Sequence, residues 1–487
     1  MFVCTAVIVF SCTTTRQYRV SQTINPLQYG LNDAKTGEER YYVLLRTHEE
    51  AQRLGVGVSY EGIKNIDLTI PAKVKPIPLS HYTDFAGVTI RVENKQKNLF
   101  LFQLTSPLIP VFVTGEEIDG GDFSKNKDLK QGVKLLIIND STLWVQRRAG
   151  HVYGATRKDI MLINNGESAN GPVMSYCTSS STPQGFYRDI AYPKKTVFKN
   201  ITFERTITST AKTYLIKVEN QYDVELSGIT INTPDGSGMY GDRSIFIVNS
   251  YKTAVRDVTI QGTYSLDSKS KGQKRFGYGI SLDNTYDFYV CNLYARANWG
   301  VFGNNNVHKA VLEKCDINRF DIHCYGKDIS FIDCNFVSLY NQLSSVYGLI
   351  SFVNCTFNIG FRPLLNNYSY NAYVGYDVSF ERCTFNMGGN NNSIIGLSGF
   401  CKEENSRPEL KEKCLPNVTM VDCIVNVSKD VKKWYVFNIE KIEGYNGRFG
   451  YLSCVNINGL SVSDKTVEME LFNGKIKTKN KVSVKYN

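Results

Sequence analysis

The chain has 487 residues, of which 42% are hydrophobic and 21% charged, so it has ample apolar material for a folded core and is not a disordered protein. Its 30 Tyr and 26 Phe favour strands, and no apolar run approaches the ~20 residues that a membrane helix needs. The formal charge of +10 favours an anionic partner; because the Lys and Arg residues are dispersed and form no zinc-finger spacing, RNP-type strand or basic helix, we expect an acidic polysaccharide and no nucleic acid.

The chain begins with a short apolar stretch, MFVCTAVIVFSC. Its last four residues, VFSC, resemble the lipobox of bacterial lipoproteins, in which the cysteine carries a lipid. The resemblance implies an exported protein of the periplasm or cell surface, anchored to the outer membrane through Cys12. A degraded export signal or a misassigned start is the alternative. We therefore expect residues 1–20 to be an export segment and leader, and residues 21–487 to form a single domain.

Two features precede the more regular part of the chain. Thr47 and Glu50 are spaced as a capping box and Gly55 is a stop signal, which together predict one short amphipathic helix. Residues from about 105 to 195 are less regular, and within them RRAGHVYGATRKDIMLINNG predicts two strands around a Gly turn. We expect this segment to be a large insertion into an early part of the fold.

From residue 198 onward the chain repeats one pattern: apolar, any, polar, apolar or Cys, any, apolar. Alternation makes each copy a strand with one buried face, and a recurrence every 19 to 40 residues is typical of a solenoid with one copy per turn. The Cys residues then pack as small apolar side chains in a column and are not metal or redox ligands. The fourth positions of the copies are Ile201, Ile229, Val258, Leu293, Cys315, Cys334, Cys355, Cys383, Cys423 and, in a looser copy, Cys454.

A second column lies in the segments that join the strands. It consists of Asn220, Asn249, Asn284 and Asn305, followed two residues later by Tyr222, Tyr251 and Tyr286. Stacked Asn side chains at a turn can hydrogen-bond from coil to coil, and stacked Tyr rings extend the apolar surface. Over about residues 195–460 these ladders resemble those of the right-handed parallel β-helix proteins, the pectate-lyase-like superfamily and its tailspike relatives. The resemblance is to carbohydrate-active proteins but is specific for fold and not for activity. It implies an all-β protein with a single right-handed parallel β-helix and a short N-terminal helix that covers the first coil.

Two late segments stand outside the repeat. Cys401 and Cys414 flank a charged segment, which predicts a loop over residues 401–414. If the protein is exported, a disulfide between these two cysteines is one alternative. The ending, KIKTKNKVSVKYN, predicts a basic closing edge strand, because charge protects such an edge from aggregation.

Aligning the strands by the Asn column separates inward from outward positions. We expect Ile216, Ile245, Ile280, Val301 and Ile322 to form one inward row. The outward rows are then Lys217, Phe246, Ser281, Phe302 and His323, and beside them Glu219, Val248, Asp283, Asn304 and Tyr325. The strand edge holds Arg243, Tyr278, Trp299 and Phe320, with Arg319 and Asp321 at the last coil.

This outward face combines the residue types that cleavage of an anionic sugar chain requires. Aromatic rings stack on sugars, guanidinium groups pair with carboxylates, and His or Tyr can move a proton. In β-elimination a cation neutralises the uronate, a base removes the C5 proton and an acid assists the leaving oxygen. We predict that His323 and Tyr325 act as base and acid and that Arg319 and Arg243 neutralise the uronate. The predicted substrate-binding residues are Tyr278, Trp299, Lys217, Asp283 and Asp321.

Alternatives stay open for the function. Asp283, Glu219 and Asp321 could instead be the paired carboxylates of a glycoside hydrolase. A third alternative is a noncatalytic surface or adhesion protein, and fold alone does not choose among the three. Calcium assists some lyases of the superfamily that the chain resembles, so Ca²⁺ is left open as a cofactor, although no clustered Asp or Glu set has ligand spacing.

Other polar groups are assigned as follows. His151, Tyr153 and Arg157 form a second candidate cluster, in the insertion. We expect His308 and Lys309 to lie in a loop, and the basic residues 269–275 to form an exposed loop that flanks the outward face.

Overall fold

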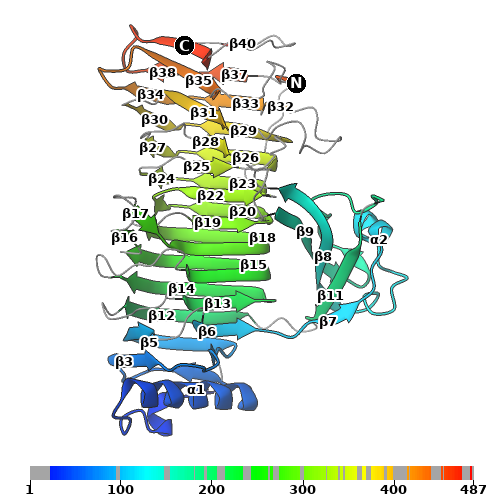
Figure 1. Ribbon diagram of the computed structural model, residues 1–487, viewed down its shortest axis with the longest axis vertical. Coiled ribbons are helices and arrows are strands. Elements are labelled where there is room, and N and C mark those ends of the chain that lie inside the picture. Colours follow the sequence, from blue (N-terminus) through cyan, green and yellow to red (C-terminus); the bar gives the residue numbers. More distant parts are fainter. Residues whose placement is uncertain are drawn as a thin grey trace.

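The computed structural model describes residues 22–487 apart from 95–98, 147–153, 180, 191–194, 206–213, 234–242, 262–263, 267–273, 297–300, 325, 338–340, 344–345, 359–364, 369–374, 389–391, 399–413, 416, 440–450, 453–454, 474–482 and 485–487. The described chain winds into a stack of parallel coils, with a separate antiparallel sheet projecting from one side (Figure 1). All strand pairs in the two large sheets are parallel, as the repeat predicts for a β-helix. No helix in the described ranges is both long and apolar enough to cross a membrane.

Two sheets run along the stack. The larger has 24 strands: β1 (Thr23–Ile24), β2 (Gly57–Ser59), β3 (Asn65–Ile70), β4 (Ile77–Pro78), β5 (Tyr82–Asn94), β6 (Phe100–Thr105), β12 (Thr196–Arg205), β13 (Tyr214–Glu219), β14 (Tyr222–Asn232), β15 (Arg243–Gln261), β18 (Tyr278–Ala295), β20 (Val307–Glu313), β21 (Asp316–Ile317), β23 (Lys327–Ile332), β24 (Asn335–Phe336), β26 (Tyr347–Val353), β27 (Thr356–Asn358), β29 (Gly375–Glu381), β30 (Thr384–Met387), β33 (Asn417–Val421), β34 (Ile424–Val427), β37 (Val455–Asn458), β38 (Ser461–Val462) and β40 (Ser483–Val484). The other has seven: β19 (Val301–Asn305), β22 (Phe320–Cys324), β25 (Asn341–Leu343), β28 (Leu365–Tyr368), β31 (Ser393–Ser398), β35 (Lys433–Ile439) and β39 (Glu468–Asn473). Two small pairs, β16 (Tyr264–Leu266) with β17 (Lys274–Phe276) and β32 (Cys414–Leu415) with β36 (Tyr451–Leu452), lie beside them.

A helix covers the N-terminal end of the stack (Figure 1). Helix α1 (Gly37–Leu54) follows a 3₁₀ turn, η1 (Pro26–Tyr29), and ends at Gly55 in the left-handed conformation, as predicted. Its start was predicted wrongly, because the capping box that forms is Thr36 with Glu39, 11 residues before Thr47. Thr47 lies inside the helix, where its hydroxyl donates to the Val43 carbonyl at 2.8 Å. The sequence therefore contains two possible capping boxes, and the helix begins at the earlier one.

The polar third position of each repeat is where the chain turns. In all nine regular copies this residue has a positive φ, between 52° and 64°, a region that Asn, Asp and Gly enter most readily. Side chains at these bends also bond between coils, as when Asn292 Nδ2 donates to Asp257 Oδ1 at 2.9 Å. The nine residues are Asn200, Gly228, Asp257, Asn292, Lys314, Asp333, Asn354, Arg382 and Asp422.

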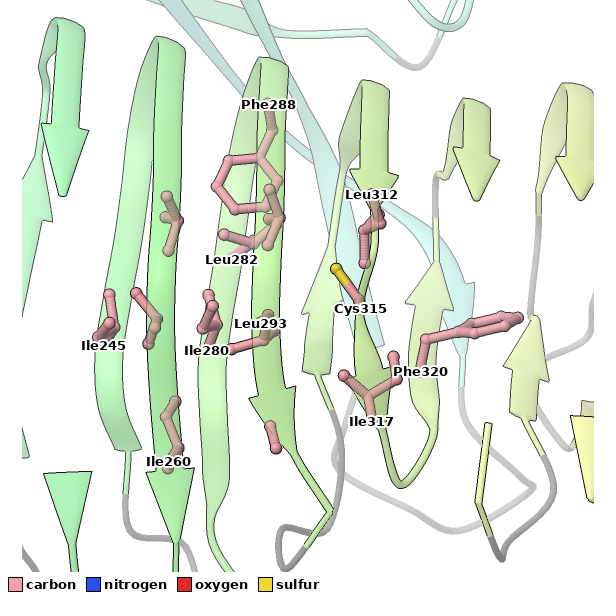
Figure 2. Packing of buried hydrophobic residues seen from close by; sticks show 14 of the residues in the cluster. Ile245, Ile260, Ile280, Leu282, Phe288, Leu293, Leu312, Cys315, Ile317 and Phe320 are labelled. Carbon is pink, nitrogen blue, oxygen red and sulfur yellow. The ribbon is translucent and has the colours of Figure 1, made fainter. Parts of the chain in front are cut away.

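The predicted Cys column is confirmed for its five regular members, which are buried and free. Each thiol lies within hydrogen-bonding reach of backbone carbonyls, such as Cys355 Sγ to the Phe331 oxygen at 3.4 Å. Figure 2 shows Cys315 within the interior, together with Leu312 and Ile317. In the described part of the chain no group of three or more His, Cys, Asp or Glu could hold a metal ion. Cys454 and Cys401 lie outside the described residues.

Phenylalanine rings fill the C-terminal coils beside this column. Phe331, Phe352 and Phe380 stack with centroids 4.9 and 5.1 Å apart, and Phe357 and Phe385 stack at 5.3 Å. Such stacking adds to the burial of apolar area, so the repeat itself supplies the core of the fold.

The segment between β6 and β12 contains its own antiparallel sheet, in the order β10-β9-β8-β11-β7. One face of this sheet packs with α2 around Phe123, Leu136 and Ile138, and the other packs on the β-helix through Leu135 and Ile137. We call this sheet with α2 the inserted sheet. Its elements are β7 (Ile109–Val111), α2 (Gly115–Gly120), β8 (Val133–Gln146), β9 (Gly154–Asn164), β10 (Glu167–Ser168) and β11 (Pro183–Asp189).

The Asn and Tyr columns hold the inserted sheet on the coils. The amides of Asn306, Asn284 and Asn249 each donate to the Oδ1 of the previous ladder member, at 2.5, 2.9 and 3.0 Å, ending at Asn220. The fourth member is thus Asn306 and not Asn305, because the coil before it departs from the expected spacing by one residue. Asn306 also donates to the Lys158 carbonyl of β9 at 2.7 Å.

The Tyr column stacks as predicted, and the inserted sheet covers it. Tyr222, Tyr251 and Tyr286 have centroids 5.7 and 5.2 Å apart and pack against Leu135 and Ile137. His308 continues this column against Tyr286 at 5.8 Å, so its assignment to a loop was wrong: His308 and Lys309 lie in β20, and His308 is buried.

Asn284 should be among the most sensitive ladder positions, because it is fully buried, has a φ of 55° and bonds to both ladder neighbours. We expect Asn284→Ala to lower the free energy of unfolding by about 2–4 kcal/mol, through unpaired amides and a strained backbone. Asn292, at a φ of 56° on an exposed bend, is the matched control, and Asn292→Ala should cost about 1 kcal/mol. Urea unfolding monitored by circular dichroism measures both, and equal losses would contradict the structural role of the buried ladder.

Candidate functional site

The predicted site residues that the structure describes lie on or next to β13, β15, β18 and β22, and we call the outward side of these strands and of β6 the lateral face. The predicted register holds for the first coils: Lys217 pairs with Phe246 and Phe246 with Ser281, while Arg243 lies between Tyr214 and Tyr278. Glu219, Val248 and Asp283 form the next outward row, as expected. Parallel strands lie about 4.8 Å apart, so each row presents one side chain per coil at nearly constant spacing.

Half-buried aromatic rings gather at the N-terminal half of the lateral face. Phe100 stacks on Tyr214 with centroids 4.7 Å apart and lies 5.9 Å from Phe246, and the Arg243 guanidinium lies 4.4 Å over the Phe246 ring. Phe100 was missed in the sequence, because the inserted sheet separates β6 from β13 by more than a hundred residues and so hides the repeat. Tyr214 was also missed, although it pairs with Arg243 in the register that the repeat predicts. The strand-like alternation of FLFQLT was the one signal that could have revealed Phe100.

Charged side chains border the aromatic rings. Lys217 Nζ lies 2.8 Å from Glu219 Oε2, which also accepts from Gln103 Nε2 at 3.3 Å. Asp283 Oδ2 lies 3.2 Å from Nζ of Lys158 on β9 of the inserted sheet. The inserted sheet thus reaches the edge of the lateral face through an ion pair.

Arg319 and Asp321 do not lie on an accessible surface, contrary to the expectation. Each side chain is only 1% exposed, and the two form an ion pair through Nη2 and Oδ2. Tyr278, which is half-buried, donates its hydroxyl to the same Asp321 oxygen at 3.1 Å. Outward direction on a strand therefore did not imply exposure here, and Asp321, paired with Arg319, accepts a hydrogen bond from Tyr278.

The register predicted for the coil of β19 was wrong. Val301 pairs with Phe320 and Asn304 with Ile322, with irregularities between them, whereas the sequence pattern paired Val301 with Ile322. The irregular pairing shows that the repeat length changes at this coil, which is also where the Asn column shifts by one residue.

Several predicted residues fall outside what the structure describes. Trp299 and Tyr325 are among the undescribed residues; His323 lies in β22, but its side chain is not described. In the second cluster His151 and Tyr153 are likewise outside the described residues. Residues 269–273 of the basic stretch are undescribed, while 274–275 lie in β17, paired with β16.

Arg157, the described member of the second cluster, is not available to a substrate. Its side chain is fully buried and Nη2 lies 2.8 Å from Asp140 Oδ2, while the guanidinium packs 4.9 Å from the Tyr176 ring. It also donates to the Ser175 carbonyl. Arg157 therefore fixes the segment after β10 inside the inserted sheet.

No protein-family model matches the chain, and no curated protein matches it. Among solved structures, the tailspike protein gp49 from Pseudomonas phage LKA1 is similar with a TM-score of 0.59 at 12% identity, covering 95% of this chain and 78% of that one. The gp54 tailspike of Acinetobacter baumannii bacteriophage AP22, in complex with A. baumannii capsular saccharide, has a TM-score of 0.51 at 12% identity and covers 95% and 79%. The chain is a right-handed parallel β-helix. At these identities the likeness establishes the fold alone.

The buried pair Arg319–Asp321 predicts a large penalty when one partner is removed. Arg319→Met leaves a buried carboxylate without its cation and should lower the free energy of unfolding by about 3–5 kcal/mol. Arg296→Met is the control, because Arg296 also forms a two-point pair, with Asp316, but is 45% exposed; it should cost about 1 kcal/mol or less. Chemical unfolding compares them, and similar losses would show that Arg319 and Asp321 are not a buried, coupled pair.

His308 predicts a pH dependence of stability. Burial, with a smaller effect of Lys327, lowers its pKa to about 3, whereas the unfolded residue titrates near 6.5. Between about pH 6.5 and 3 the unfolded chain binds a proton that the folded chain does not, so this residue removes stability as the pH falls. His308→Phe keeps a ring against Tyr286 and should lose less stability than the wild type between pH 7 and pH 4.

Thermal unfolding at both pH values measures this difference. Burial raises the pKa of Asp159 to about 7, which acts in the opposite sense, lowering stability as the pH rises from about 4 to 7. Asp159 is present in both proteins and cancels in the comparison. A difference in Tm between wild type and variant that is the same at pH 7 and pH 4 would refute the role of His308.

Proposed function

We propose that the protein degrades a polysaccharide and that the lateral face binds the glycan. The observation that carries this is the set of half-buried rings on successive coils, Phe100, Tyr214 and Phe246, with Arg243 stacked on the last. Rings of this kind stack on sugar faces, and repetition from coil to coil matches a linear polymer lying along the stack. The capsular saccharide in the AP22 tailspike complex is consistent with a polysaccharide as the partner of this fold.

An acidic glycan fits this face better than a neutral one. The chain has a net charge of +10, and Arg243 on the lateral face has an aromatic ring as its described neighbour instead of a paired carboxylate. A guanidinium in this setting can pair with a uronate carboxylate in a two-point geometry. We therefore propose Arg243 and Lys217 as the groups that attract and orient the acidic sugar.

The proposed reaction is β-elimination at a uronic acid unit. Arg243 withdraws charge from the carboxylate, a base removes the C5 proton, and the C4–O bond breaks as an acid protonates the leaving oxygen, which gives an unsaturated sugar without water being consumed. His323 and Tyr325 remain the proposed base and acid. Tyr278 pairs with Arg243 in the sheet and its hydroxyl is held by Asp321; we propose that it binds the sugar beside Arg243.

Hydrolysis is the second candidate, favoured by one geometric feature. Glu219 and Asp283 lie in one outward row, two coils apart, a spacing of about 9–10 Å between their strands. Inverting glycosidases separate their two carboxyl groups by about 6.5–9.5 Å. In the structure each carboxylate is paired with a lysine, Lys217 or Lys158.

Export is a separate part of the proposal. It rests on the N-terminal sequence alone, as does the lipid anchor on Cys12 at the outer membrane. An exported location would bring the protein to extracellular glycan. Labelling of the full chain with a radioactive fatty acid, lost in Cys12→Ala, tests it.

The reaction is tested with a panel of pectin, alginate and glycosaminoglycan substrates alongside neutral glycans. Ultraviolet absorbance of unsaturated products indicates β-elimination, and new reducing ends without that absorbance indicate hydrolysis. Binding without cleavage would show a noncatalytic surface protein, and neither binding nor cleavage would contradict the proposal as a whole. Unchanged turnover in His323→Ala would remove His323 from the mechanism.

Arg243→Ala should lower the rate of cleavage of the acidic substrate by about 10²-fold or more, because it removes a charge that stabilises the developing enolate. Arg91→Ala is the control, since Arg91 is exposed on another side of the coils and pairs with Asp67 and Glu204. Initial rates from the absorbance assay compare the two. Equal rates for Arg243→Ala and Arg91→Ala would place the reaction away from the lateral face.

A further inference from the structure

A cavity of about 450 Å³ lies where the inserted sheet meets the N-terminal coils. Gln52 of α1, Ser80 and His81 after β4, and Thr105 at the end of β6 line one side. Arg188, on β11 of the inserted sheet, lines the other. Two parts of the fold far apart in sequence therefore enclose one space beside the lateral face, and we call it the Arg188 pocket.

Among the described residues, only one nitrogen of the Arg188 guanidinium has a hydrogen-bond partner. Nη1 donates to Ser106 Oγ at 2.9 Å, to the Asn220 carbonyl at 2.6 Å and to Gln221 Oε1 at 3.1 Å. The structure gives Nε and Nη2 no partner among the described residues. These two atoms form the edge of a guanidinium that binds a carboxylate by two parallel hydrogen bonds.

The positive charge of Arg188 also has no carboxylate partner in the described part of the chain. All three of its acceptors are neutral. The neighbouring Asp189 also lines the pocket, but it pairs with Lys134. Burial lowers the pKa of Arg188, with no opposing contribution from an acidic group. A partly buried cation without a counter-ion is costly, and an anionic ligand would relieve that cost.

The rest of the lining suits a compact polar ligand with one apolar side. Tyr222 offers a ring, Leu79 an aliphatic side chain, and Thr105 and Gln52 polar groups. The volume falls in the range of small-molecule sites, about 300–1,000 Å³. Sugars combine hydroxyl groups with an apolar ring face, which is the combination that this lining offers.

We propose that the Arg188 pocket binds a carboxylate-bearing sugar, with its carboxylate on Nε and Nη2 of Arg188. The requirement for a carboxylate rests on Arg188 alone, whereas the choice of a sugar rests on the proposed function. The pocket adjoins the lateral face at Thr105, so it is a second site for the acidic glycan, apart from the residues proposed for cleavage.

Isothermal titration calorimetry of the full chain with D-glucuronate, D-glucose and acetate tests the ligand class. Glucuronate should bind at least 10-fold more tightly than either glucose, which lacks the carboxylate, or acetate, which lacks the sugar. Glucose binding as tightly as glucuronate would overturn the role of the charge. Acetate binding as tightly as glucuronate would overturn the proposed sugar specificity and show a site for carboxylates in general.

Two variants locate the binding site. Arg188→Lys keeps the positive charge but removes the two nitrogens that bind a carboxylate together. Gln52→Glu places a negative charge in the same pocket, on an exposed helix position and with a side chain of nearly the same size. Each variant should weaken glucuronate binding at least 10-fold. Arg91→Lys is the control: Arg91 is exposed on another side of the coils and pairs with Asp67 and Glu204, so this variant should leave the binding unchanged, with circular dichroism confirming the fold of all three. Undiminished binding to both Arg188→Lys and Gln52→Glu would overturn the proposal. Polysaccharide cleavage is measured in a separate assay. A protein that cleaves no substrate would therefore contradict the proposed function without affecting the measurement of glucuronate binding to the Arg188 pocket.

Discussion

The fold depends on hydrogen bonding between successive coils at bends where the backbone adopts positive φ. Each regular repeat places its polar third residue in this conformation, and the buried Asn ladder forms a second set of such bends. A parallel sheet alone leaves the position of each turn loosely specified. Amide groups that donate to the coil before and accept from the coil after fix that position, because a shift by one residue would leave buried amides unpaired.

The same ladder explains how the inserted sheet is held in place. Ladder amides donate to carbonyl groups of β9, and the Tyr column, which would otherwise be an exposed apolar stripe, packs against β8 and β9. The inserted sheet in turn reaches Asp283 on the lateral face and encloses the Arg188 pocket against the first coils. The ladder therefore helps to hold Lys158 against Asp283 on the lateral face and to enclose the proposed second sugar site.

The β-helix could be predicted from the sequence because its repeat is local and its side-chain period is two, which places Cys334, Cys355 and Cys383 at the same position of successive copies. The prediction of the site was weaker for two physical reasons. The inserted sheet interrupts the repeat, which hid Phe100, and a change of coil length near β19 moved the ladder from Asn305 to Asn306. Alternation predicts direction but not burial, so the interior pair formed by Arg319 and Asp321 looked like a surface pair.

The most direct test of the central claim is a crystal structure of the protein with an oligosaccharide of the glycan that it cleaves or binds. The proposed function predicts sugar rings lying along the coils against Phe100, Tyr214 and Phe246, with a carboxylate on Arg243. An oligosaccharide bound instead to the opposite side of the coils, with the lateral face empty, would contradict it.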